Sequence, residues 1–497
     1  MKLTNAGKLK LLIVFLLVLT CTGCALVTNI SEAQKYVQAG KYKEAEQLYL
    51  KAINELKSDS SLKGQIYNNL GVIYDKQGRY KEAEQAWLRA LEIKKTSGED
   101  KYLASGFHNL GCLYLQQARY KEAKQFMQEG NAIWVRTEGS NYIDLVSSFD
   151  SLAGLQYRLG NYQEADALAK QALAIAEKQL SSHPKYMGYA YGAFGGIYYD
   201  QGRYTDAEKA YQQSLGFFRQ ELGAEHPDNV ESLTGLAKVY AAEDRSSEAE
   251  TLYRHAANIA QKSLSTANPT LADALDGQSD LYRKQGRTVE AEENYKRALI
   301  MREQMMGMEH PEIAKSLNNL GGLYLDQQRL ADAEPFFLRA LAMQEKMLGS
   351  EHPKLAATLD NLAQVRARQG RMKESDALYQ RAIDIQERVL GSQHPDVAQT
   401  LYNQGGLYFQ LKRYPGCEEN FQRALSIRQA AFGGHHPDVA RSLNSLGVLY
   451  AVQGQYAKAE PLLTQAVSIF EAVFKPDHWE IAKCREDLEK LRKAKGH

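Results

Sequence analysis

The sequence predicts an all-α fold, a right-handed α-solenoid of about eleven helix pairs followed by one capping helix. Two regularities predict it. A turn residue recurs at positions 40, 78 and 118 and then, from Ala118 onward, at every 42nd residue up to Gly454. Five residues after each turn stands a small residue, an alanine in most repeats and Ser375 or Cys417 in two of them. A small side chain there lets two helices approach closely.

The stretch 67–95 shows the unit that repeats. Apolar residues at helical spacing mark two amphipathic helices, separated by a break at Gln77-Gly78-Arg79 where Gly78 is free to take a left-handed conformation. The first apolar stripe contains Leu70, Ile73 and Tyr74, and the second contains Ala83, Trp87, Ala90 and Leu91.

These motifs resemble the tetratricopeptide repeat. The residues that carry the resemblance are Leu70, Gly71, Tyr74, Gly78, Tyr80, Ala83 and Ala90, and again Leu446, Gly447, Tyr450, Gly454, Tyr456 and Ala459. The ordinary repeat of that family has about 34 residues. The longer repeat here, with Leu-Gly-x-x-His-Pro at 348–353, is similar to that of kinesin light chains. The resemblance implies that the first helix of each pair lines a concave face, which takes an extended peptide or a helix.

The joints between pairs have a regular signal from about residue 220 onward. Gly223, Gly349, Gly391 and Gly433 each fit a left-handed helix end, and a His-Pro pair then starts the next helix. Helix spacing of about 10 Å separates consecutive histidines, so two of them cannot share a metal ion. We therefore expect these histidines to act as turn or cap residues.

Composition excludes several classes of function. Lys and Arg total 61 and Asp and Glu total 60, so no overall field attracts nucleic acid or an acidic substrate. No phosphate loop, nucleophile elbow or zinc-protease motif occurs. The sequence thus indicates a protein that is not an enzyme, with no cofactor, no metal, no nucleic-acid partner and no small-molecule substrate. Cys112, Cys417 and Cys484 are interpreted as structural.

The amino terminus has the features of an export signal. Three lysines precede the apolar run 11–19, and small residues lead to Gly23-Cys24. This resembles a bacterial lipoprotein signal, although Cys21 stands where that signal usually has leucine. The resemblance implies a signal peptide over 1–23, lipid attachment at Cys24, a tether over 24–30, and a place on the outer membrane facing the periplasm. The alternative is an uncleaved anchor that leaves the repeats in the cytoplasm.

Asparagines recur just before the Leu-Gly pair. By resemblance to kinesin light chains they are candidate partner-binding residues of the concave face, since an amide offers a donor and an acceptor to a peptide backbone. The alternative is that they bond neighbouring helices. Asp150, Ala193, Gly235 and Gly277 interrupt the series. The candidates are Asn68, Asn69, Asn109, Asn318, Asn319, Asn361, Asn403 and Asn444.

The expected domains are the solenoid over 31–475 and a capping helix within 476–497, whose apolar stripe is Ile481, Cys484, Leu488 and Leu491. The units that start at Leu233 and Leu275 match the repeat least well, so we expect poorer packing there. The leading functional hypothesis is an exported, membrane-anchored scaffold that binds a protein or peptide, in an envelope or secretion complex. A cytoplasmic peptide sensor is the alternative, and an enzyme comes last.

Overall fold

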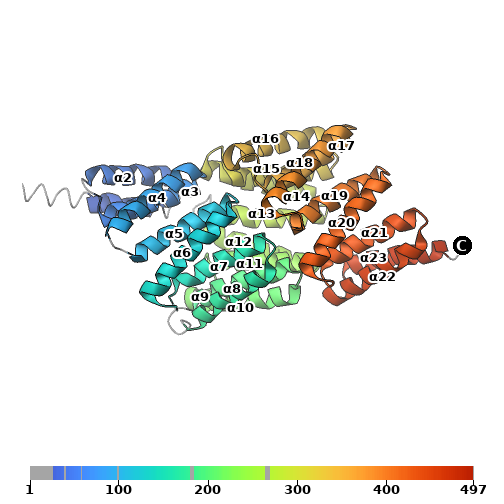
Figure 1. Ribbon diagram of the computed structural model, residues 1–497, viewed down its shortest axis with the longest axis horizontal. Helices are drawn as coiled ribbons and strands as arrows, with labels where there is room; N and C mark the ends of the chain where they lie inside the picture. The colour runs from blue at the N-terminus through green and yellow to red at the C-terminus, as the bar shows by residue number, and fades with distance from the viewer. Residues whose placement is uncertain are drawn as a thin grey trace, which may run out of the picture. The chain divides into compact units, whose positions relative to one another are not determined.

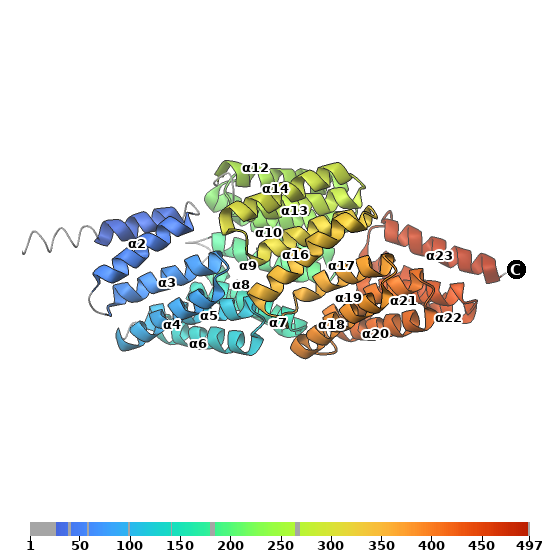
Figure 2. The same ribbon diagram turned by 90° about the horizontal axis from the view of Figure 1, so that it is seen from above.

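The computed structural model describes residues 26–37, 41–56, 59–97, 100–140, 142–178, 184–263 and 269–495. Its elements in these ranges are all helices, which follow one another as antiparallel pairs (Figures 1 and 2). Eleven pairs precede a final single helix, as the repeat predicted. In the labels used below, an odd number marks the first helix of a pair and an even number marks the second helix.

The first pair consists of the helix over 26–37 and α2 (Tyr42–Glu55). This helix therefore includes residues 26–30, which the sequence suggested as part of a tether. The next pairs are α3 (Ser61–Lys76) with α4 (Tyr80–Ser97), α5 (Asp100–Gln116) with α6 (Tyr120–Glu138), α7 (Asp144–Arg158) with α8 (Tyr162–Lys178), and α9 (Lys185–Asp200) with α10 (Tyr204–Leu222).

The middle and the end of the chain continue in the same way. The pairs are α11 (Asn229–Ala242) with α12 (Ser246–Ser263), α13 (Pro269–Lys284) with α14 (Thr288–Met306), and α15 (Pro311–Asp326) with α16 (Leu330–Leu348). They are followed by α17 (Leu355–Arg368) with α18 (Met372–Leu390), α19 (Pro395–Gln410) with α20 (Tyr414–Phe432), and α21 (Pro437–Val452) with α22 (Tyr456–Val473), before the final helix α23 (Trp479–Lys495).

The chain divides into two compact units. Unit 1 contains residues up to 114 together with 121–140, and unit 2 contains residues 115–120 and everything from 141 onward. Unit 2 therefore holds eight complete pairs, α7 to α22, and α23.

The turns at positions 78 to 454 confirm the predicted left-handed residue, whereas the first one, at Gly40, lies outside the described residues. Gly78, Gly160 and Gly202 have φ of 70°, 75° and 68°. Ala118 and Asp244 hold the same place with φ of 56° and 62°, although they carry a side chain. The conformation is therefore fixed by the fold of the pair, since a non-glycine residue adopts it only at some cost in free energy.

The predicted small position is the closest point of each pair. All eleven of its residues have zero exposed surface, including Ser375 and Cys417. Burial raises the pKa of the Cys417 thiol to about 12, so this cysteine is an unreactive substitute for alanine. Two helices that meet on a methyl-sized side chain leave no space for a larger one.

The joints between pairs differ from the prediction in one respect. Gly223, Gly349 and Gly391 have φ of 92°, 93° and 97° but ψ of 161°, 159° and 150°. This is an extended conformation with positive φ, which is nearly restricted to glycine, and it is not the left-handed helical cap expected from the sequence. The chain leaves the helix at once and turns toward the His-Pro pair.

The histidines of the joints are helix caps, as predicted. The Nδ1 atoms of His310, His394 and His436 each accept a hydrogen bond from the backbone N–H two residues later, at 3.1 Å. Their side chains are buried.

The first helices form the inner side of unit 2. Consecutive first helices contact one another directly, as α7 with α9, α9 with α11 and α17 with α19. In a curved stack of helix pairs, the helices that approach their equivalents in neighbouring pairs lie on the concave side. This geometry places the first helices where the resemblance expected them.

Unit 2 closes on itself through the same histidines. The Nε2 atom of His394 lies 2.8 Å from the carbonyl oxygen of Arg158, and the Nε2 atom of His478 lies 3.0 Å from that of Ala242. His352 meets Gln116 at 2.9 Å and His436 meets Asp200 at 3.4 Å. Each contact joins residues 236 apart, about 5.6 repeats of 42 residues. We call this line of contacts the seam.

Aromatic rings pack along the seam and complete it. Tyr162 lies 5.4 Å from Phe432, and Tyr204 lies 5.7 Å from Phe474, between ring centroids. A Cβ added to Gly202 would lie 2.6 Å from Cδ of Pro437, so no larger residue fits there without movement. Successive turns of the solenoid are therefore in close contact.

The seam corrects the expectation of poor packing after Leu233 and Leu275. Both side chains are buried in one core cluster that also contains Val439, Phe470 and Phe474. Residues from the last repeats of the chain thus belong to the same core as the repeats whose own motif is weakest. The capping helix α23 belongs to the same arrangement: its predicted stripe of Ile481, Cys484, Leu488 and Leu491 is buried.

A buried arginine links neighbouring pairs on the inner side. Arg302 of α14 is 1% exposed; its guanidinium lies 2.8 Å from Asp276 and 2.6 Å from Asp273, and it donates to Ser316 at 2.5 Å. Arg428 is buried as fully as Arg302, and it donates to the Ser442 hydroxyl at 2.7 Å. Arg302 and Ser316 form the equivalent contact three repeats earlier. These charges are held by several partners at once, as burial requires.

Candidate functional site

The asparagines predicted as binding residues lie on the first helices, and most of their amides are already used within the protein. Asn109 donates to the Oδ1 atom of Asn68 at 3.0 Å, and Asn69 donates to the Tyr49 hydroxyl at 3.2 Å. Asn318 donates to Thr358 at 2.6 Å.

Toward the carboxyl end the same kind of contact recurs. Asn403 donates to the Asp360 carboxylate, and Asn444 donates to Asp487 at 3.5 Å while its Oδ1 accepts from Cys484. Apart from the bond of Asn69 to Tyr49 on the second helix α2, these bonds join neighbouring odd-numbered helices. Bonding to neighbouring helices is the alternative that the sequence left open for this series. They do not test whether the same amides also face a partner.

Asn319 and Asn361 differ from the others. Both are half-buried on α15 and α17, and neither side chain makes a hydrogen bond within the described residues. An amide in a partly covered place keeps its donor and its acceptor available for an incoming backbone. Among the predicted asparagines, these two are therefore the best candidates to hydrogen-bond a partner.

A cavity of about 640 Å³ lies along the seam and reaches the asparagine series at Asn403. One wall comes from the ends of α7 and α9, with Tyr157, Arg158 and Asp200, and the other comes from α17 and α19. Burial raises the pKa of Asp200 to about 6 and also raises that of Asp360, although its bond from Asn403 opposes the shift. The cavity therefore carries carboxyl groups that gain a proton more readily than usual.

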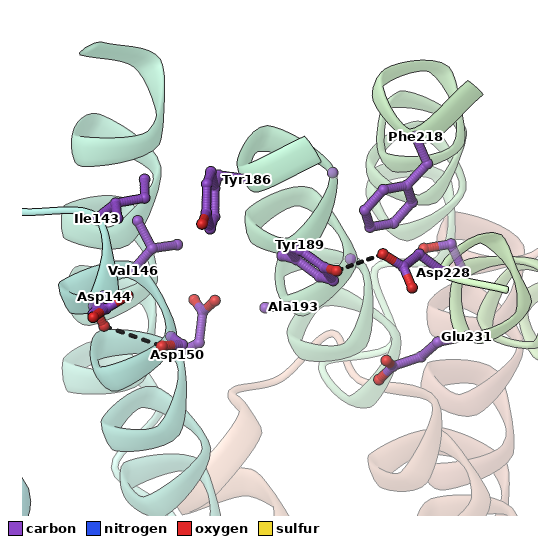
Figure 3. A pocket seen from close by; sticks show the side chains of 14 residues that line it. Ile143, Asp144, Val146, Asp150, Tyr186, Tyr189, Ala193, Phe218, Asp228 and Glu231 are labelled. Atoms are coloured by element: carbon purple, nitrogen blue, oxygen red, sulfur yellow. Dashed lines mark hydrogen bonds between the residues drawn. The ribbon is translucent and has the colours of Figure 1, made fainter. Parts of the chain in front are cut away.

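A second cavity of about 380 Å³ lies between α7, α9 and α11, with one wall from α10 (Figure 3). We call it the acidic hollow. It exists because the chain has small residues there: Gly188, Gly192 and Ala193 line it on α9. At Gly188 an added Cβ would lie 2.6 Å from the Phe218 ring, so the glycine lets this ring reach the hollow.

Carboxylates and aromatic rings line the hollow. The carboxylates are Asp144 and Asp150 of α7, Asp228 in the joint before α11, and Glu231 of α11. The Tyr189 hydroxyl donates to Asp228 at 2.5 Å, as Figure 3 shows. Tyr186 and Tyr189 lie 6.3 Å apart between ring centroids, and Tyr189 meets Phe218 edge-on at 5.0 Å.

Sequence reasoning did not identify this hollow as a site. It did note that Asp150 and Ala193 interrupt the asparagine series, and the hollow occupies that interruption. The useful signal would have been the combination of missing side chains at 188, 192 and 193 with acidic residues at 144, 150 and 231.

Residues 1–25 lie outside the described part of the chain, and with them Cys24 and the expected signal peptide. Among the residues that are described, no helix has the length and apolar character needed to cross a membrane. The described residues also contain no group of three or more histidine, cysteine or acidic side chains arranged to hold a metal ion.

The chain is an α-solenoid: helix pairs repeat along it, a small residue is buried between the two helices of each pair, and the first helices form a concave face. Solenoids of this kind serve protein recognition. Models of the tetratricopeptide repeat match residues 62–130, 145–184 and, in overlapping segments, 186–472. The chain belongs to the tetratricopeptide repeat family. No curated protein matches it.

Several solved structures are similar to parts of the chain. One, from Podosopora anserina, is provisionally described as a kinesin light chain with nearly identical TPR-like repeats; it is 24% identical, with a TM-score of 0.36, over 42% of this chain and 97% of that one. BtubC (BKLC) from P. vanneervenii is 24% identical, with a TM-score of 0.36, over 50% of this chain and 94% of that one. Yeast Tom70 is 14% identical, with a TM-score of 0.43, over 95% and 96%.

Proposed function

We propose that this protein is a non-catalytic interaction scaffold that binds a protein or peptide along the concave face of its repeats. The observation that carries the proposal is the pair of uncommitted amides, Asn319 and Asn361, at equivalent places on neighbouring first helices. Equivalent places in adjacent repeats lie about 10 Å apart, close to the length of three residues of extended peptide. A peptide that runs across the pairs can therefore meet one amide after another.

The family supports this proposal, because tetratricopeptide repeats build extended surfaces for protein partners. The asparagines that bond neighbouring helices have a compatible role, since they fix the inner helices against one another. A surface that is already rigid loses little conformational entropy on binding.

Crosslinking in intact cells, followed by purification of the protein, tests the proposal. The comparison is between the wild type and Asn319→Ala/Asn361→Ala/Asn403→Ala. The control removes three exposed amides from second helices, Gln213→Ala/Gln261→Ala/Gln429→Ala. We expect a discrete partner with the wild type and with the control, and loss of that partner with the concave-face variant.

Two results would count against the proposal. Retention of the partner by the folded concave-face variant would move binding to another surface. Absence of any crosslinked partner with the wild type would contradict the scaffold function itself. Circular dichroism and urea unfolding of the purified variants establish that each one is folded.

We also propose that the protein is exported and held in the bacterial envelope by a lipid on Cys24, with a role in assembling an envelope or secretion complex. The support is the lysine-rich start, the short apolar run 11–19 and the Gly23-Cys24 pair. An apolar run of that length is shorter than the roughly 20 residues of a membrane span.

Labelling of growing cells with a fatty-acid analogue tests the anchor. The label is expected on the wild type and absent from Cys24→Ser, and its persistence on Cys24→Ser would refute lipidation at this residue. Protease treatment of intact and permeabilised cells separates the envelope location from the alternative, a cytoplasmic peptide sensor with an uncleaved anchor.

A further inference from the structure

The acidic hollow brings carboxyl groups without ion pairs together in one cavity. Several acidic residues in the first turns of other helices are paired with arginine, as Glu248 is with Arg245 at 2.7 Å and Glu290 with Arg287 at 2.6 Å. In the hollow, Asp144, Asp150 and Glu231 form no ion pair within the described residues, and no lysine, arginine or histidine lines the cavity. Three of the four carboxyl groups in the hollow thus have no ion pair, whereas the Oδ1 atom of Asp228 lies 3.6 Å from Nδ1 of His226.

One of these groups lacks even a hydrogen bond. The Oδ1 atom of Asp150 is fully buried and has no partner in the described structure. Figure 3 shows the Asp150 side chain extending from α7 into the space between α7 and α9, on the side of the Tyr186 ring. A buried carboxyl oxygen without a partner costs free energy, and a ligand that supplies a donor would remove that cost.

The aromatic rings suit the same kind of ligand. In Figure 3 Tyr186 lies above Asp150, Tyr189 lies beside Asp228, and the Phe218 ring lies above Asp228. The Tyr186 ring already has one cation near it, since Nζ of Lys185 lies 5.6 Å from its centroid. Aromatic faces attract cations and also cover the apolar stem that carries a cation in lysine and arginine. An acidic group would be repelled by the carboxylates of the hollow.

We propose that the acidic hollow binds a basic side chain of the partner, an arginine by preference, at the Asp150 carboxyl group, with the Glu231 charge and the Tyr186 and Tyr189 rings elsewhere in the lining favouring its entry. Arginine fits better than lysine because its planar guanidinium can pair with one carboxylate through two N–H groups at once. This inference rests on the proposed function, since it assigns one recognition site within the concave face. The site is separate from the asparagines, which do not extend to this part of α7 and α9.

Selection from a random nonapeptide library displayed on phage tests the assignment. The immobilised proteins are the wild type, Asp150→Asn/Glu231→Gln, and a charge-matched control, Glu293→Gln/Asp477→Asn, which removes two exposed carboxylates outside the hollow. We expect arginine, and to a lesser extent lysine, to be enriched in peptides selected by the wild type and the control. The enrichment should disappear with the hollow variant.

A selected peptide then gives a quantitative test. Replacing its arginine by citrulline, which has nearly the same shape without the charge, should weaken binding to the wild type about tenfold or more. The same replacement should change binding to Asp150→Asn/Glu231→Gln less than about twofold. Ala193→Leu, which fills the hollow without altering charge, should weaken the arginine peptide to a similar extent.

Proton release on peptide binding is a second measurement. It would not change if Asp150 had only a structural role. Burial raises the pKa of Asp150 to about 8, and the groups facing it, Asp144 on α7, Tyr186 and Tyr189 on α9, and Glu231 on α11, include no cation. In the free protein Asp150 is therefore mainly the neutral acid at pH 7, and a bound cation would favour the carboxylate form. Calorimetry in buffers of different ionisation enthalpy should detect release of about one proton on binding to the wild type and none with Asp150→Asn.

The outcomes separate this inference from the proposed function. Selected peptides without basic residues, or basic enrichment that persists in the hollow variant, would overturn the inference and leave the scaffold proposal standing. If the wild type selects no peptide at all, both proposals fail. Binding of the arginine peptide to the wild type without proton release would remove Asp150 from the site.

Discussion

The seam should make the protein sensitive to acid, and His352 provides the clearest case. Nδ1 of its buried imidazole accepts a hydrogen bond from the backbone N–H of Lys354. Nε2 lies 2.9 Å from the carbonyl oxygen of Gln116, which belongs to the same unit. Burial lowers the pKa of His352 to about 4, with Lys354 and Arg158 adding to the shift and the Gln116 bond opposing it. Only the neutral ring with a proton on Nε2 can form both bonds.

The sign and size of the effect follow from linkage. The unfolded chain takes up a proton on this histidine below pH 6.5, whereas the folded protein takes it up only near pH 4. Stability from this residue is therefore complete above pH 6.5 and is lost as the pH falls toward 4. At about 1.36 kcal/mol per pKa unit, the loss is about 2 kcal/mol between pH 7 and 5, and about 3.4 kcal/mol over the whole range.

Urea unfolding at constant ionic strength between pH 7 and 5 measures this loss. His352→Asn keeps a side-chain acceptor for the cap but cannot titrate. It should be less stable than the wild type at pH 7, and its loss of stability on acidification should be smaller by about 2 kcal/mol. The matched control is His435→Asn, at an exposed position. An unchanged dependence on pH in His352→Asn would refute the reasoning.

Three further predictions concern stability and are measured by urea unfolding at pH 7. Arg302→Ala leaves Asp276 buried without its partner and should cost about 3–5 kcal/mol; a cost below about 1 kcal/mol would mean that the ion pair is not buried in solution. Ala333→Leu should cost about 1–3 kcal/mol through overpacking at the closest point of its pair, whereas the exposed Ala331→Leu should be nearly neutral. Gly391→Ala should cost about 1–3 kcal/mol because φ is 97°, although no neighbour obstructs a Cβ; the helical Gly406→Ala, equally unobstructed, should be neutral or stabilising, and equal effects would contradict the conformational argument.

The sequence predicts most of what is local to a repeat. The left-handed turn, the buried small residue, the histidine caps and the apolar stripe of α23 each depend on residues within about 20 positions of one another, and each is confirmed. The glycines at the joints were recognised as special, but their conformation was not, because a positive φ fits glycine at more than one value of ψ.

The seam and the acidic hollow depend on a different kind of information. Whether His394 reaches Arg158 is decided by the small rotation from each pair to the next, summed over almost six repeats, and no local pattern records that sum. The hollow depends on side chains that are missing, at Gly188 and Gly192, and an absence is easily interpreted as a weaker match to the repeat.

The seam also changes how unit 2 should fold. In an ordinary repeat protein each unit touches only its neighbours, so the ends fray independently and folding can begin anywhere along the chain. Contacts between residues 236 apart raise the average sequence separation of the native contacts, which slows folding because a long loop must close first. Once formed, they couple the first pairs of the unit to the last. Unit 2 should therefore exchange its buried amide hydrogens as one cooperative body, in contrast to a linear array of repeats.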